Sequence, residues 1–165
     1  MLIARYAKIA MSLALAAFCL LVAFDNLSDY GTNYLFVQHV LSMDTTFPGN
    51  ALRGRAITSP ALWTIAYWLI ILAEAVTGVI LAFATIRLLS TARGPASSFT
   101  RAKHTAVLGF GLGFLLWFTG FMVIGGEWFG MWQSKDWNGV PSAFRFDVVL
   151  LVVAVFLMQR DEELA

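Results

Sequence analysis

The 165-residue sequence has one cysteine, two histidines and few charged side chains. The single cysteine, Cys19, excludes an internal disulfide, a thiolate metal cluster and the membrane thiol oxidoreductases, which work with pairs of cysteines. Charged residues make up 13% of the chain, whereas soluble domains contain about a quarter. Because the net charge is only +1, the chain lacks the basic surface that nucleic acid requires, and we expect no nucleic-acid partner.

Hydrophobic residues make up 59% of the chain and gather in four long runs, at about residues 3–24, 61–86, 105–125 and 143–158. A helix needs about 20 apolar residues to cross the hydrocarbon core of a bilayer, and the first three runs are long enough. The fourth run is shorter, and we expect Arg145 and Asp147 to lie at the membrane interface. The sequence therefore predicts an all-α fold, a four-transmembrane-helix bundle that forms one domain over residues 1–165.

Lysine and arginine are distributed unevenly between the two sides of such a bundle. Seven lie on the side of the termini and four on the other: Arg5, Lys8, Arg87, Arg93, Arg101, Lys103 and Arg160 against Arg53, Arg55, Lys135 and Arg145. This bias predicts that the N-terminus and the C-terminus are both cytoplasmic. The connector between the second and third runs, "LLSTARGPASSFTRAKH", is expected to be a solvated turn, and we assign no function to the tail "RDEELA".

Glu74 lies near the middle of the second run, where the sequence offers no lysine or arginine at a comparable depth. An acidic side chain at the bilayer centre costs about 2.5–3.5 kcal/mol on insertion scales and marks a functional hypothesis. Glu74 either binds a proton, a ligand or a partner subunit, or is a neutral side chain that holds helices together. Its carboxyl is expected either to be protonated at neutral pH or to be hydrogen-bonded to Tyr67, Trp117, Thr119 or a freed backbone carbonyl.

Small residues recur four apart on the same two helices, at Gly78 and Ala82 and at Gly109 and Gly113. Such spacing lets two helix backbones approach closely in a membrane. Since Glu74, Gly78 and Ala82 share one helix face, we expect Glu74 to point into a packed interface. That interface lies either within the chain or between chains.

The segment "NYLFVQHVLSMDTTFPGN" connects the first two runs and holds His39 and Asp44. Thr32 or Asn33 is a suitable cap for a short helix over Tyr34–Met43. This helix is apolar on most sides, so we expect an amphipathic element against the extracytoplasmic mouth of the bundle. The Asp44 carboxylate can fix the tautomer of the His39 imidazole, and we favour a structural histidine that organises this loop.

We expect no metal and no cofactor. One histidine among carboxylates is a weak zinc signature. His39 and His104 are predicted on opposite sides of a hydrocarbon core about 30 Å thick, so they cannot ligate one haem iron.

The last extracytoplasmic loop carries Trp128 and Trp132. Indoles at this level form an interfacial belt in most membrane proteins, and an aromatic pocket for a quinone, lipid or carbohydrate is the alternative. Arg53 and Arg55, in the first loop, are either solvated or bind lipid phosphate or a partner's acids.

The stretch "DNLSDYGTNYLFVQHVLSMDTTF", followed by "RAI" and the membrane residue Glu74, resembles a bacterial family of predicted small integral membrane proteins of unknown function, the domain-of-unknown-function 2165 family. The resemblance covers essentially the whole chain, and "FVQHVLSMDTTF" is a fairly specific part of it. The positions that fit the family pattern are Asn33, Phe36, Val37, His39, Val40, Ser42, Met43, Asp44 and Thr45. The resemblance implies four spans and a multi-pass protein of the bacterial inner membrane, but no reaction, cofactor or substrate.

Three function classes remain. We favour a small non-catalytic subunit or scaffold that packs against other membrane subunits, or against itself, in a larger membrane complex such as a respiratory one. The alternative is a proton- or ligand-binding membrane module, for transport or for lipid or quinone binding, that uses Glu74 and the His39/Asp44 loop. An enzyme with His39 as base and Ser42 as nucleophile is the third and weakest, because no catalytic set surrounds these residues.

Overall fold

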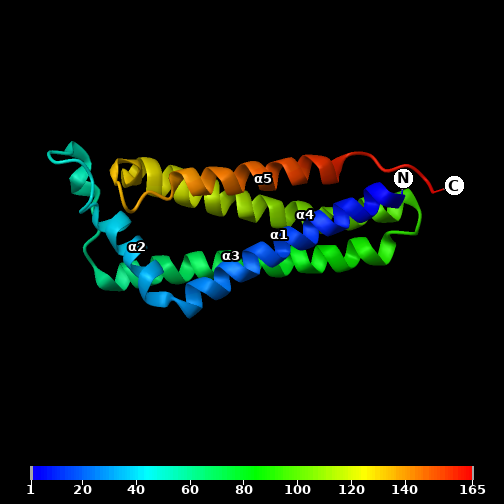
Figure 1. Ribbon diagram of the computed structural model, residues 1–165, viewed down its shortest axis with the longest axis horizontal. Helices are drawn as coiled ribbons and strands as arrows, with labels where there is room; N and C mark the ends of the chain where they lie inside the picture. The colour runs from blue at the N-terminus through cyan, green and yellow to red at the C-terminus, as the bar shows by residue number, and fades with distance from the viewer. Residues whose placement is uncertain (1, 165) are drawn as a thin grey trace.

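The computed structural model describes residues 2–164 and shows an elongated bundle of long helices (Figure 1). Within these residues, four helical segments are long and apolar enough to cross a membrane. They are α1 (Leu2–Ser28), α3 (Pro60–Thr91), the continuous pair α4 (Ala96–Phe114) and η2 (Leu115–Trp128), and α5 (Val140–Met158). The predicted all-α fold with four spans is therefore confirmed.

Three short helices lie in the connections: α2 (Tyr30–Ser42), the 3-10 helix η1 (Ala51–Arg55) and the 3-10 helix η3 (Met131–Gln133). Both termini lie at one end of the bundle, which we call the terminal end, and α2 lies toward the opposite end, which we call the cap end (Figure 1). The 33–50 segment and the N-terminus thus lie toward opposite ends of the spans, as the four-span topology requires.

The helices extend beyond the apolar runs that predicted them. α1 continues to Ser28, α3 continues to Thr91, and α4 already begins at Ala96. Most of the connector expected to be a solvated turn is therefore helical, and only Ala92–Pro95 breaks the helix. A helix can continue through polar residues because its main-chain hydrogen bonds do not depend on side-chain polarity. It ends near Gly94-Pro95 because proline lacks an N–H and restricts the residue before it.

The amphipathic helix of the first connection also begins earlier than predicted. α2 starts at Tyr30 with Asp29 at its N-cap, so the expected cap residues Thr32 and Asn33 lie inside the helix. It ends at Met43, whose left-handed backbone (φ 53°) closes the last turn through a bond from its N–H to the Val40 carbonyl. α1 and α2 are separated by Asp29 alone, and this leaves Asn33 one turn into α2.

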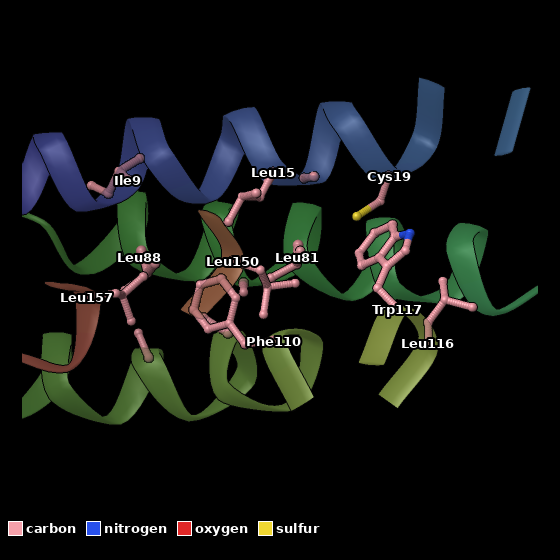
Figure 2. Packing of buried hydrophobic residues seen from close by; sticks show 14 of the residues in the cluster. Ile9, Leu15, Cys19, Leu81, Leu88, Phe110, Leu116, Trp117, Leu150 and Leu157 are labelled. Atoms are coloured by element: carbon pink, nitrogen blue, oxygen red, sulfur yellow. The ribbon is translucent and has the colours of Figure 1, made fainter. Parts of the chain in front are cut away.

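α3 is the central helix, and it packs most extensively against α1 and α4. Its buried residues Leu81 and Leu88 meet apolar side chains from α1, α4 and α5 along the length of the bundle (Figure 2). The indole of Trp117, from η2, lies at one end of this cluster near Cys19 (Figure 2). Lipid tails are as apolar as these side chains, so close van der Waals packing must hold the helices together.

The glycines at helix-packing spacing lie at contacts inside the chain. A Cβ atom on Gly78 would lie 2.7 Å from Cγ of Leu20, on α1, and one on Gly109 would lie 2.6 Å from Cδ2 of Leu81. Gly113 gives the same close approach to Leu150, on α5. Ala82 is partly buried against the same core. All three glycines therefore lie at contacts between helices of the same chain. None of them is available to pack against a second chain.

Candidate functional site

Glu74 is buried, with 2% of its surface exposed, and it is held by a residue of another helix. Its Oε2 accepts a hydrogen bond of 2.7 Å from Nδ2 of Asn26, in the last turn of α1. The Tyr67 hydroxyl, seven residues before Glu74 on the same face of α3, donates a 2.7 Å bond to the Asn26 backbone carbonyl. The three side chains thus link α1 to α3 inside the bundle.

The side chain that bonds Glu74 is not one of the predicted hydrogen-bond partners; it is Asn26. Tyr67 acts through Asn26, and neither Trp117 nor Thr119 is bonded to the carboxylate in the described chain. Asn26 lies beyond the apolar run 3–24, so the sequence did not place it in the first span. Only the extension of α1 to Ser28 brings its amide to the depth of Glu74.

A pocket of about 300 Å³ opens in front of this carboxyl, and we call it the Glu74 pocket. Residues from all four spans and from α2 line it. Its polar side chains are Asn26, Asn33, Tyr67, Glu74, Asn138 and Ser142, and its apolar wall includes Trp117 and Phe146. Glu74 is the only carboxyl among these lining residues, so it is the natural anchor for a hydrogen-bonding ligand.

An apolar groove adjoins the Glu74 pocket between α3 and η2. It consists of two hollows of about 210 and 330 Å³ that share Leu69, Ile70, Leu116, Gly120 and Ile124. Its lining is almost entirely hydrocarbon, and Leu69 is largely exposed on the surface that lipid would cover.

Four side chains line both the Glu74 pocket and the apolar groove: Phe36, Val37, Ile70 and Phe121. They form the boundary between a pocket that carries polar side chains and an almost entirely apolar groove. The two spaces are therefore adjacent and share these side chains as a common boundary.

The groove owes its shape to η2, which is a π-helix of 14 residues. Bonds of the i to i+5 type widen the helix, and the Phe129 N–H accordingly bonds the Ile124 carbonyl at 3.0 Å. Gly120 and Gly125, which have no side chain, both line the groove. Short π-helical turns are frequent at functional sites. The sequence predicted an ordinary helix here, because an apolar run has the same composition in either form.

Asp147 corrects a second prediction. It was expected at the membrane interface, but it is 4% exposed and faces the core between the buried residues Ala143 and Leu150 of α5. Within residues 2–164 neither carboxylate oxygen has a hydrogen-bond partner, and the same holds for the buried Thr77 hydroxyl. A lone carboxyl so placed is costly unless neutral or solvated. The bundle therefore buries two acids between its helices, Glu74 and Asp147, where the sequence indicated one.

His39 and Asp44 lie together at the cap end. The imidazole Nδ1 is 2.8 Å from Oδ2 and 3.0 Å from Oδ1 of Asp44. The imidazole also stacks on Trp137, with ring centroids 4.5 Å apart and an interplanar angle of 22°. Neither His39 nor Asp44 lines the Glu74 pocket. The contacts join α2 to the segment before α5, which suits a structural histidine.

The remaining candidates form a second set of cap contacts. The guanidinium of Arg55 lies 4.4 Å from the ring centroid of Trp128 and donates a 3.2 Å bond to its carbonyl. Trp132 packs edge-on against Phe47, with centroids 5.8 Å apart, and Arg53 is exposed. These tryptophans lie away from the Glu74 pocket, whose indole is Trp117. No group of three or more His, Cys, Asp or Glu side chains within residues 2–164 could hold a metal ion.

Four long apolar helices define a small integral membrane protein, which would sit in a lipid bilayer. The chain belongs to the family described as predicted small integral membrane protein, domain of unknown function 2165, whose model matches residues 4–160. No curated protein and no solved structure matches it. The family resemblance of the sequence is thereby confirmed.

Proposed function

We propose that this protein binds an amphiphilic molecule from the bilayer, a lipid or a quinone-like compound with a hydrogen-bonding head and an apolar tail. The observation that carries the proposal is the shared wall between the Glu74 pocket and the apolar groove. A polar head can occupy the first space while a hydrocarbon tail lies in the second. Pockets of some hundreds of Å³, mostly apolar with a few converging polar groups, are typical of ligand sites.

Glu74 has capacity for such a head. The described chain gives its carboxyl one hydrogen bond, at Oε2 from Asn26, and none at Oε1. Asn33, Asn138 and Ser142 contribute further donors and acceptors on the opposite walls. A hydroxyl or carbonyl head therefore finds partners on several helices, and a charged headgroup would meet no cation among these lining residues.

The test is retention of amphiphiles by the full chain purified in mild detergent, measured by native mass spectrometry and by organic extraction. Glu74→Gln removes the carboxyl at nearly constant volume, and a hydrogen bond to a charged group is worth about 1.5–3 kcal/mol. We therefore expect retention of the bound species to fall about tenfold or more. Glu127→Gln, a change of the same kind at an exposed carboxyl, should retain it. Equal retention by both variants would remove Glu74 from the site.

A non-catalytic subunit of a larger membrane complex is the second candidate. The exposed aromatic pair Phe47 and Trp132 at the cap end favours it, since two large aromatic side chains there are available to a neighbour. Stoichiometric co-purification of other subunits in mild detergent, lost in a Phe47→Ser/Trp132→Ser variant, would support this role. A monodisperse protein that runs alone would contradict it.

A further inference from the structure

Three basic side chains at the terminal end are buried. Arg5, Lys8 and Lys103 are 1%, 2% and 1% exposed, although each was counted among the charges that set orientation. We call them the basic cluster. The C-terminal residues 159–164, which lie outside regular helix and which we call the tail segment, cover them.

The tail segment contacts the basic cluster through oxygen atoms only. Asp161 forms ion pairs with Lys8, at 2.9 Å, and with Lys103. Both ammonium groups also donate 2.7 Å bonds to the Gln159 carbonyl. The guanidinium of Arg5 donates a 2.9 Å bond to the Glu162 carbonyl. This set of contacts is one that a bound oxyanion would make.

The charges of this arrangement do not balance. Within residues 2–164, Asp161 is the only carboxylate bonded to the basic cluster, so three buried basic groups there face one anion. Arg5 has no carboxylate partner, and its other bonds go to the Ala92 and Gly94 carbonyls just after α3. Carbonyl groups at a helix C-terminus compensate a cation only in part. A buried excess of positive charge attracts an anion with more charge than one carboxylate.

Space for such an anion lies beside the cluster. A pocket of about 240 Å³ is lined by Arg5, Lys8, Phe156 and the tail segment. The Glu163 carboxylate is used elsewhere, because it accepts the Ala96 N–H at the start of α4, at 3.0 Å.

We propose that the basic cluster is a binding site for a phosphoryl group, and that Asp161 occupies it in this structure as an internal substitute. A phosphoryl group presents oxygens for Lys8 and Lys103 and a further one for Arg5, and it brings the additional negative charge that the cluster lacks. The group comes either from the headgroup of an anionic lipid or from free phosphate. Displacement of the tail segment opens the site.

The experiment titrates the full chain, in zwitterionic detergent, with short-chain phosphatidylglycerol, short-chain phosphatidylcholine and inorganic phosphate, followed by native mass spectrometry. Asp161→Asn removes the competing carboxylate, and we expect it to raise affinity for phosphatidylglycerol about tenfold. Glu127→Gln removes the same charge from an exposed side chain of η2 that does not line the pocket beside the basic cluster, and it should leave affinity unchanged. Adding Lys103→Gln to Asp161→Asn should abolish the gain.

The pattern of ligands separates the two sources. A gain for phosphatidylglycerol alone supports a lipid headgroup, and a gain for inorganic phosphate as well supports a phosphoryl site open to solvent. Equal affinities of wild type and Asp161→Asn, or an equal gain for phosphatidylcholine, would overturn the proposal. If Asp161→Asn folds poorly, a chain truncated after Arg160 provides a second test, because it also lacks the competing carboxylate. Phosphate should then raise the midpoint of thermal unfolding of the truncated chain.

Discussion

Asp161 shows how one side chain in a short tail can hold a bundle closed. Burial alone would raise the pKa of its carboxyl, but the ammonium groups of Lys103 and Lys8 outweigh burial and hold the pKa below its usual value. A carboxyl whose pKa is lower in the folded state stabilises that state above its unfolded pKa, about 3.9. This stability is lost as the pH falls through the folded pKa.

We therefore expect Asp161→Asn to lower stability at neutral pH by about 3–5 kcal/mol, the usual effect of breaking a buried ion pair. The difference between wild type and variant should shrink below about pH 4, where the wild-type carboxylate becomes protonated. Thermal unfolding in zwitterionic detergent from pH 7 to pH 3 measures both effects. A difference that is constant with pH would show that the ion pairs do not stabilise the bundle.

The sequence identified a buried polar residue when it lay in the middle of an apolar run. It missed buried polar residues near the ends of the runs, because their burial depends on how far each helix extends and how it packs. Glu74 stood out because the centre of an apolar run is a costly place for an acid. Asn26 and Asp147 each lie near the end of a run, where polarity looks ordinary, so their burial follows only from the helix extent and packing. The basic cluster was missed likewise, because a lysine beside a span is usually solvated.

At the element scale, η2 gives the bundle a feature that hydrophobic patterning does not encode. Its glycines leave open the groove beside α3, and the Gly120 position is free of crowding, since a Cβ atom there would meet nothing nearer than 4.0 Å. The side chain of a larger residue at 120 can therefore extend into the groove without displacing backbone.

Gly120→Leu should accordingly block the groove and lower retention of the bound amphiphile severalfold, while the chain still folds. Gly111→Leu is the matched control, because Gly111 is exposed on α4, has no atom within 4 Å of its Cβ position and lines neither space. Native mass spectrometry of both variants, with unfolding midpoints as a check, measures the effect. Loss of ligand from both variants, or from neither, would argue against a tail in the groove.

At the scale of the whole molecule, the four-span topology was predictable because about 20 apolar residues per span leave few alternatives. The placement of both termini at one end follows from the even number of spans. Which end faces the cytoplasm is a matter of charge. The basic residues of the terminal end include three that the structure buries, Arg5, Lys8 and Lys103. The exposed basic residues that remain are Arg87, Arg93, Arg101 and Arg160 on that side, against Arg53, Lys135 and Arg145 at the cap end.

We infer from this exposed surplus that the terminal end is cytoplasmic and the cap end periplasmic. Cys19 is fully buried, so a single cysteine can be introduced on each side without a competing accessible thiol. Asp136→Cys lies at an exposed cap position, and Ser97→Cys lies at an exposed position near the start of α4. In spheroplasts, a membrane-impermeant maleimide should label Asp136→Cys directly and Ser97→Cys only after lysis. The reverse pattern would show the opposite orientation, with the basic cluster at the other leaflet. Labelling of both cysteines before lysis would contradict a four-span bundle.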